Sequence, residues 1–283
     1  MSATTRSTDP PEGPGTTGAP APTRPAPAGD RALRLRDVTI TFGGVTALDG
    51  VSFEVHPGRI CGLIGPNGAG KTTLFNCITR IYVPSSGQIL WGDTDLLRLR
   101  PHALAGAGIA RTFQNLALFG AMSVFDNAMV GGTSVSRVGL TSGALGWPPA
   151  RRRQQALRDR AWHLLDRLDL LDVAERPAAG LPFGTLKRVE LARALMSQPA
   201  LLLLDEPAGG LTHSEVKDLG SLITSLRDEL GFAALLVEHH MGLVLGISDH
   251  VVALDFGRTI FEGSPSAVRD NPDVVRAYLG RAA

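Results

Sequence analysis

Apolar residues change their spacing along the chain, and each spacing predicts a type of element. In "LRLRDVTITF" (33–42) and "VSFEV" (51–55), apolar and polar residues alternate, which predicts antiparallel strands with glycine and proline turns between them. Other segments contain unbroken apolar runs, typical of parallel strands buried on both faces. These are "RICGLIG" (59–65), "ALLLLDEP" (200–207), "FAALLVEHH" (232–240) and "HVVALDFGRTIFEG" (250–263).

Residues 101 to 180 follow a mainly helical pattern. In "QQALRDRAWHLLDRLDLLD", apolar side chains recur every three or four residues and so share one helix face. The Gly/Ser-rich stretch at 131–153 has neither period and predicts an irregular insertion. We therefore expect an α/β lobe with parallel strands, interrupted by a helical lobe at roughly residues 100 to 185.

Composition narrows the class of protein. The chain has 283 residues, of which 43% are hydrophobic, enough to fill a sizeable core. Its 28 basic and 27 acidic residues leave a net charge of +1, so no global field favours nucleic acid, and none is expected as a partner. Cys61 and Cys77 lie in predicted buried elements and are interpreted as core residues in a reducing cytosol.

The first 30 residues differ from the rest of the chain. They contain seven of the 19 prolines and almost no large apolar side chains, which predicts a disordered tail. They lack the apolar core of a secretory signal, and nowhere does an uncharged apolar run approach the ~18 residues that would indicate a membrane span.

A glycine-rich stretch, "GPNGAGKTT", follows one predicted buried strand and opens a helix. It matches the pattern G-x-x-x-x-G-K-[ST], in which glycines let backbone N–H groups converge on phosphate oxygens at a helix N-terminus. Lys71 would bind the β and γ phosphates, Thr72 would supply a hydroxyl to Mg²⁺, and Thr73 could reach another phosphate. The nucleotide-binding candidates here are Gly65, Pro66, Asn67, Gly68, Ala69, Gly70, Lys71, Thr72 and Thr73.

Two other strand ends carry candidate chemistry. Asp205 is placed to hold Mg²⁺, and the adjacent Glu206 to polarise an attacking water. His239 follows another apolar run, where it either hydrogen-bonds the γ phosphate or is an ordinary polar histidine. Strand alternation would turn His240 to the opposite side.

The nucleotide base is predicted to be adenine. The N/T-K-x-D motif of guanine-specific P-loop proteins is absent, and adenine is commonly held by stacking. Phe42 is the candidate aromatic platform; the alternative is a phenylalanine of the β-subdomain core.

Five motifs in fixed order carry a family resemblance: the glycine-rich loop, "RTFQ" (111–114), "LPFGTLKRVELARAL" (181–195), "LLLLDEP" and "VEHH". From about residue 33 to 280 the chain resembles ATP-binding subunits of ATP-binding cassette (ABC) transporters. "TFGGVTALDGVSFEV" and "NPDVVRAYLG" are similar to the branched-chain amino acid importer type. The resemblance implies a P-loop NTPase fold of the ABC type, with an antiparallel β subdomain and a helical subdomain, over residues 31–283.

The resemblance also implies roles and partners. Gln114 would contact Mg²⁺ and the attacking water, Glu206 would be the catalytic base, and His239 the switch histidine. Two ATPase domains would close head to tail around ATP, with a different chain favoured as the second subunit and a homodimer as the alternative. Transmembrane permease subunits, and indirectly an extracytoplasmic solute-binding protein, would complete a complex at the cytoplasmic face of the membrane.

The signature loop departs from the family's LSGGQ pattern. Pro182, Phe183 and Thr185 replace its serine, first glycine and glutamine, and the proline removes a hydrogen-bond donor to the partner's γ phosphate. Gly184 and Thr185 are still expected to help bind that ATP, with Thr185 as the N-cap of a helix beginning near residue 186. Thr212 also replaces an aspartate common in the D-loop, the segment after "LLLLDEP".

Three alternatives remain open. The chain could energise an importer of another small polar solute, such as an amide or urea. It could be a soluble ABC ATPase acting in translation or DNA repair, or a regulatory module that holds ATP without turnover. Glu206 argues against the last.

Overall fold

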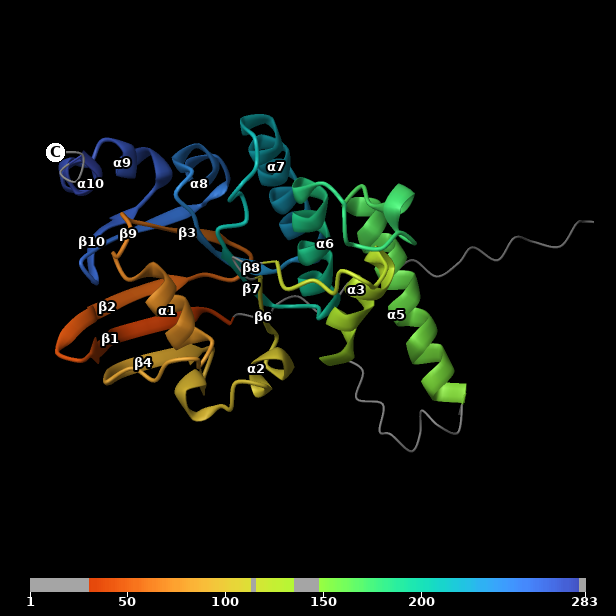
Figure 1. Ribbon diagram of the computed structural model, residues 1–283. Helices are drawn as coiled ribbons and strands as arrows, with labels where there is room; N and C mark the ends of the chain where they lie inside the picture. The colour runs from red at the N-terminus through yellow and green to blue at the C-terminus, as the bar shows by residue number, and fades with distance from the viewer. Residues whose placement is uncertain (1–30, 113–115, 135–147, 280–283) are drawn as a thin grey trace, which may run out of the picture.

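The computed structural model describes residues 31–112, 116–134 and 148–279, which form two sheets and a group of helices (Figure 1). The smaller sheet is antiparallel, with the order β2-β1-β4-β5. Its strands are β1 Leu33–Phe42, β2 Val45–Val55, β4 Ser86–Trp91 and β5 Thr94–Asp95.

The larger sheet has six strands in the order β10-β9-β3-β8-β7-β6. Only the pairing of β10 with β9 is antiparallel, and the other four pairings are parallel. Its strands are β3 Ile60–Ile64, β6 Ile109–Arg111, β7 Leu201–Asp205, β8 Ala233–Val237, β9 His250–Asp255 and β10 Arg258–Gly263. The carboxyl ends of β3, β7 and β8 therefore lie at one edge of the sheet.

Helices cover the larger sheet and extend beyond it. The helices α3, α5 and α6 pack on one another at one end of the molecule, away from the antiparallel sheet, while α8, α9 and α10 pack near β3, β9 and β10 (Figure 1). The helices are α1 Lys71–Ile78, α2 Ala103–Gly106, α3 Val124–Gly131, α5 Pro148–Arg167, α6 Phe183–Met196, α7 His213–Leu230, α8 Met241–Ile247, α9 Pro265–Arg269 and α10 Pro272–Leu279. Short 3₁₀ turns are η1 Leu96–Arg98, η2 Gly132–Ser134 and η3 Leu171–Val173.

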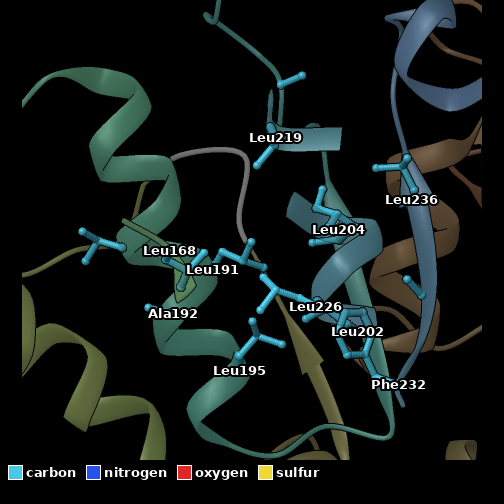
Figure 2. Close-up of a cluster of buried hydrophobic side chains, with 14 of the residues drawn as sticks. Leu168, Leu191, Ala192, Leu195, Leu202, Leu204, Leu219, Leu226, Phe232 and Leu236 are labelled. Carbon is cyan, nitrogen blue, oxygen red and sulfur yellow. The ribbon is translucent and has the colours of Figure 1, made fainter. Parts of the chain in front are cut away.

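The strand β7 separates two hydrophobic cores. Leu202 and Leu204 lie in the core formed with α6 and α7, which also contains Leu191 (Figure 2). Leu201 and Leu203 alternate onto the other face and belong to the core formed with α1 and the antiparallel sheet. Both faces of β7 are thus covered, which explains its uninterrupted run of leucines.

The predicted α/β class, with an antiparallel sheet beside a mainly parallel one and helices, is confirmed. Two short strands were missed: β5, which has two residues, and β6, which pairs in parallel with β7 inside a stretch expected to be mainly helical. Both are too short to reveal a period of two. The predicted tail at 1–30 lies outside the described residues. Within them, no helix combines the length and the apolar character that a membrane span requires.

Candidate nucleotide site

The glycine-rich loop joins β3 to α1. Gly65, Gly68 and Gly70 all have positive φ angles, of 151°, 78° and 104°. A Cβ on Gly65 would lie 2.3 Å from the carbonyl oxygen of Leu254, whereas one on Gly68 would meet nothing within 4 Å. The first glycine is therefore required by close backbone packing, and the second by the left-handed conformation of an open loop.

Lys71 begins α1 and turns its side chain back over the loop. It is 7% exposed, and its Nζ donates to the carbonyl oxygens of Gly65 at 2.6 Å and Pro66 at 3.0 Å. Among the described residues, no side chain caps α1, which starts from Gly70 and has no acidic residue in its first turn. A buried ammonium beside a helix N-terminus suits an anionic ligand such as a phosphate.

The other predicted residues of this loop surround that lysine. Asn67, Gly68 and Thr72 are exposed, Pro66, Gly70 and Thr73 are half-buried, and Gly65 and Ala69 are buried. Ala69 supports the loop from beneath, because its carbonyl accepts from the backbone N–H of Gly257 at 3.0 Å. The loop thus presents polar groups on one side and packs with the other.

Parallel pairing brings the carboxylates and the histidine to the same sheet edge. Asp205 ends β7 opposite Val237, which ends β8, so Glu206 and His239 follow neighbouring strand ends. The Oε2 atom of Glu206 lies 3.9 Å from Nδ1 of His239. Glu206 has a φ angle of 47°, rare for a residue with a side chain, and its N–H donates to the Val237 carbonyl at 2.9 Å. Local strain of this kind is typical of functional sites.

A buried carboxylate that the motifs did not single out supports the histidine. Glu238 is fully buried; one oxygen accepts from the N–H of Ala208 at 2.7 Å, and the other from the N–H groups of His239 and His240 at 3.0 and 3.2 Å. It therefore joins the segments that follow β7 and β8. The available signal was an acidic residue at the end of an apolar run.

The predicted orientation of His240 is wrong. Because β8 ends at Val237, strand alternation does not continue to the histidines. The rings of His239 and His240 instead lie side by side, with centroids 4.5 Å apart and planes at 34°.

Phe42 lies outside the hydrophobic cores of the described residues. It ends β1, is 44% exposed, and meets the edge of the Tyr82 ring at a centroid distance of 5.1 Å. Tyr82 is itself 37% exposed. This exposure does not fit the alternative interpretation of Phe42 as a core residue, and it leaves aromatic surface for stacking on a base.

The predicted start of the signature helix is wrong. Helix α6 begins at Phe183, and Pro182 is its N-cap, with φ −54° and ψ 148°. Proline fits there because a helix start does not need its missing N–H. Thr185 is therefore not the N-cap, and Gly184 is helical. A Cβ on Gly184 would lie 2.7 Å from Oε1 of Glu215, the end of a flexible side chain, so α6 passes close to α7 here.

The side chain of Phe183 connects α6 to the D-loop. A Cβ on Gly210 would lie 2.9 Å from this ring, and the Nζ of Lys187 lies 5.5 Å from the ring centroid. Lys187 is 5% exposed and donates at 3.4 Å to the backbone carbonyl of Glu206. Thr212 caps α7 in a capping box with Glu215. Gln114 lies outside the described residues.

Comparison with known proteins supports this assembly of loop, strand ends and helix. The "ABC transporter" family model matches residues 48–209, more than half of the chain. The chain belongs to the ABC transporter family. It is accordingly an ATP-binding, ATP-hydrolysing domain of this family. A second model, "Branched-chain amino acid ATP-binding cassette transporter", matches residues 258–283.

Relatives of known name fall within this ABC family. The chain is 44% identical to the high-affinity branched-chain amino acid transport ATP-binding protein LivG of Escherichia coli K12, over 88% of this chain and 98% of that protein. BraF of Pseudomonas aeruginosa, named for the same transport, is 41% identical with the same coverage. The ADP conformation of a solved ABC transporter cassette has a TM-score of 0.77 and 32% identity, covering 88% of this chain and 99% of that chain.

Proposed function

We propose that this chain is the ATP-hydrolysing subunit of an importer for branched-chain or related amino acids. The observation that carries the proposal is the meeting of Lys71, Asp205, Glu206 and His239 at the carboxyl edge of one sheet, in a chain 44% identical to LivG. The family and its ATPase activity support the reaction, and the names of the relatives support the solute class.

The residues of the site suit Mg²⁺ and ATP. The hydroxyl of Thr72 and the carboxylate of Asp205 are oxygen ligands of the kind that Mg²⁺ prefers, and Asp205 lies 2.6 Å from a terminal nitrogen of the buried Arg111. Bound Mg²⁺ would neutralise charge on the β and γ phosphates. Lys71 binds the same phosphates, Glu206 orients and deprotonates the attacking water, and His239 hydrogen-bonds the γ phosphate.

A groove beside this site suits a segment of a permease. It has a volume of about 550 Å³ and lies between the α2–β6 region and the helices α3 and α6. Its lining is mainly apolar and includes Ile81, 57% exposed, and Phe119, 52% exposed. Exposed apolar surface of this kind favours a protein partner. We place the transmembrane subunit's contact here, with the chain bound peripherally at the cytoplasmic face.

The signature end of α6 would act on ATP held by a second ATP-binding subunit. Pro182 is the N-cap of this helix and Phe183 is 44% exposed, so the face lies open for contact. A different second chain would make the two composite sites unequal, because only one of them would contain the altered signature. An importer for an amide or urea remains the alternative within the same assembly.

The test is reconstitution of a transporter from this chain, permease subunits, a second ATP-binding subunit and a solute-binding protein. We expect ATP hydrolysis in proteoliposomes to rise when leucine, isoleucine or valine is supplied with the binding protein, and labelled leucine to accumulate inside. Urea and acetamide serve as matched solutes. If only urea or acetamide stimulates hydrolysis, the amino-acid assignment is rejected. If the permease does not change the rate of hydrolysis, a soluble ATPase is favoured.

A further inference from the structure

The metal carboxylate of the proposed site already has a cationic partner. Arg111, on β6, donates from one terminal nitrogen to Oδ2 of Asp205 at 2.6 Å. Its other terminal nitrogen donates to Oδ1 of Asn76 at 2.9 Å and to Oγ1 of Thr79 at 3.0 Å. The guanidinium also lies over the ring of Phe75, 5.5 Å from its centroid.

Burial makes this ion pair energetically important. The side chains of Arg111 and Asp205 are only 10% and 5% exposed. Removing one member of a buried pair leaves an uncompensated charge away from water, which is strongly unfavourable. The anchoring of Arg111 on Asn76 and Thr79, at the end of α1, fixes the guanidinium in front of the carboxylate. The fold thus keeps a positive charge beside Asp205 before any metal binds.

We propose that Arg111 is a positioning residue that acts as an internal counter-ion for Asp205, and that Mg²⁺ competes with it for this carboxylate. The inference rests on the proposed role of Asp205 in holding Mg²⁺. The two cations repel each other, and each compensates the same buried negative charge. Arg111 therefore stabilises the metal-free protein, holds the carboxylate oriented, and limits the affinity of the site for Mg²⁺.

The position of Arg111 extends this role beyond the metal. Arg111 and Thr79 both line the 550 Å³ groove that we assign to the permease. One side chain thus borders the partner-binding groove and bonds directly to the metal carboxylate. It provides a short physical connection between the two surfaces.

Competition between cations has a reciprocal consequence. If Arg111 weakens Mg²⁺ binding, removing Arg111 must strengthen it by the same coupling factor. In Arg111→Met, Mg²⁺ would also relieve the cost of a buried unpaired carboxylate. A purely structural arginine would lower stability in the same way but leave the Mg²⁺ dependence unchanged.

The experiment measures thermal unfolding of the full chain during Mg²⁺ titration at a fixed, saturating concentration of a non-hydrolysable ATP analogue. We expect Arg111→Met to unfold at a lower temperature than wild type without Mg²⁺. Its Mg²⁺ midpoint should be about tenfold lower, and its Mg²⁺-induced stabilisation larger. In the co-expressed complex, its kcat should fall while the Mg²⁺ concentration for half-maximal turnover also falls.

Arg227→Met is the matched control. Arg227 pairs with Asp249 at 2.9 Å, with side chains 15% and 23% exposed, but Asp249 precedes β9 at the opposite edge of the sheet. This control should lose stability and keep the wild-type Mg²⁺ midpoint. If Arg111→Met does not fold, Arg111→Lys replaces it. Lysine keeps the positive charge but cannot contact Asp205, Asn76 and Thr79 at the same time, so the Mg²⁺ midpoint should fall by a smaller factor.

The possible failures can be distinguished. A wild-type protein that shows no Mg²⁺-dependent stabilisation would overturn the proposed metal role of Asp205, and the competition with it. A normal wild-type response, with an unchanged or raised midpoint in Arg111→Met, would overturn the role of Arg111 alone.

Discussion

The carboxyl end of β7 and the start of α6 hold their functional residues by different means. Asp205 is 4% exposed on a strand covered on both faces, and Glu206 is joined by backbone hydrogen bonding to β8. At α6, no side chain of the described residues caps the helix start, and Phe183 is 44% exposed. The first region is organised within the chain, whereas the second ends in open surface.

The comparison teaches which parts of the site need a partner. The residues that we propose to act on this chain's own nucleotide are held by strand pairing and buried hydrogen bonds within the chain. By contrast, the start of α6, which we propose to contact ATP on another subunit, lies at open surface. Phe183 and Lys187 connect the two regions, because the Phe183 ring packs beside Gly210 and Lys187 donates to the Glu206 carbonyl.

Glu206→Gln should have the largest effect. The amide matches the carboxylate in size but cannot accept the proton of the attacking water, so turnover should fall by about 10²- to 10⁴-fold. Nucleotide binding should persist, because the glycine-rich loop is unchanged. Phosphate release by the assembled complex measures the first quantity, and fluorescence of a labelled ATP analogue the second.

Glu229→Gln is the control for this change. Glu229 is a surface carboxylate that bonds His163 and Arg167, and it lies on the distant end of α7. Its turnover should match wild type. Unchanged turnover in Glu206→Gln would reject the catalytic base and favour the regulatory ATP-holding module.

Pro182→Ser tests the other region, with a smaller expected effect. Serine at the N-cap position restores a hydroxyl that can cap the helix or reach the partner's γ phosphate. One phosphate hydrogen bond that acts on the transition state corresponds to roughly a tenfold change in rate. We expect turnover to rise by about this factor at one of the two composite sites. Single-turnover kinetics of the complex should then show that one of two hydrolysis phases has become faster.

The affinity of this chain's own glycine-rich loop should not change in Pro182→Ser. Pro265→Ser, at the start of α9, is the matched control and should leave both phases unchanged. If both phases accelerate equally, the signature acts at two equivalent sites and a homodimer is indicated. If neither changes, the start of α6 does not act on ATP.

Local motifs made much of the nucleotide edge predictable. The spacing of glycines and lysine at 65–73, and acids directly after an apolar run, each lie within a few residues of one another. By contrast, the hydrogen bonds of Arg111 with Asp205 and of Tyr278 with Gly65 join residues 94 and 213 positions apart. Nothing in their local sequence indicates a partner. The start of α6 was missed because Pro182 and Gly184, taken together, suggest a loop. A proline also fits the N-cap position of a helix, which Pro182 occupies.

Tyr278→Phe tests whether the organised region depends on the C-terminal helix. The N–H of Gly65 donates to the Tyr278 hydroxyl at 2.8 Å, which ties α10 to the first residue of the phosphate loop. Removing the acceptor from this partly buried N–H should cost about 1–1.5 kcal/mol of unfolding free energy. Urea denaturation measures the loss, and ATP affinity should weaken several-fold.

Tyr82→Phe is a close control, because Tyr82 and Tyr278 are the two tyrosines of the chain. The side chain of Tyr82 meets Phe42 by its ring and is half-exposed, so loss of its hydroxyl should leave stability unchanged. Equal effects in both variants would show that α10 does not support the loop through this bond.

Thr212→Ala should have the smallest effect, and one on stability alone. The Thr212 hydroxyl caps α7, accepting from the N–H of Glu215 at 3.4 Å and donating to its carboxylate at 2.7 Å. Losing such a cap should cost about 1 kcal/mol. Because this residue supports α7 instead of the catalytic edge, kcat should stay within about twofold, and urea denaturation with steady-state kinetics would check both.

The contribution of this cap to folding stability should also depend on pH. The backbone N–H and then the hydroxyl of Thr212 lower the pKa of Glu215. A carboxyl whose pKa is lower in the folded state stabilises that state above its unfolded pKa, and this contribution is lost as pH falls through the folded value. The stability difference between wild type and Thr212→Ala should therefore shrink in acid, while Thr224→Ala, within the same helix, should show no such trend. A fall in kcat larger than tenfold would instead place Thr212 in the contact between subunits, where the family often has an aspartate.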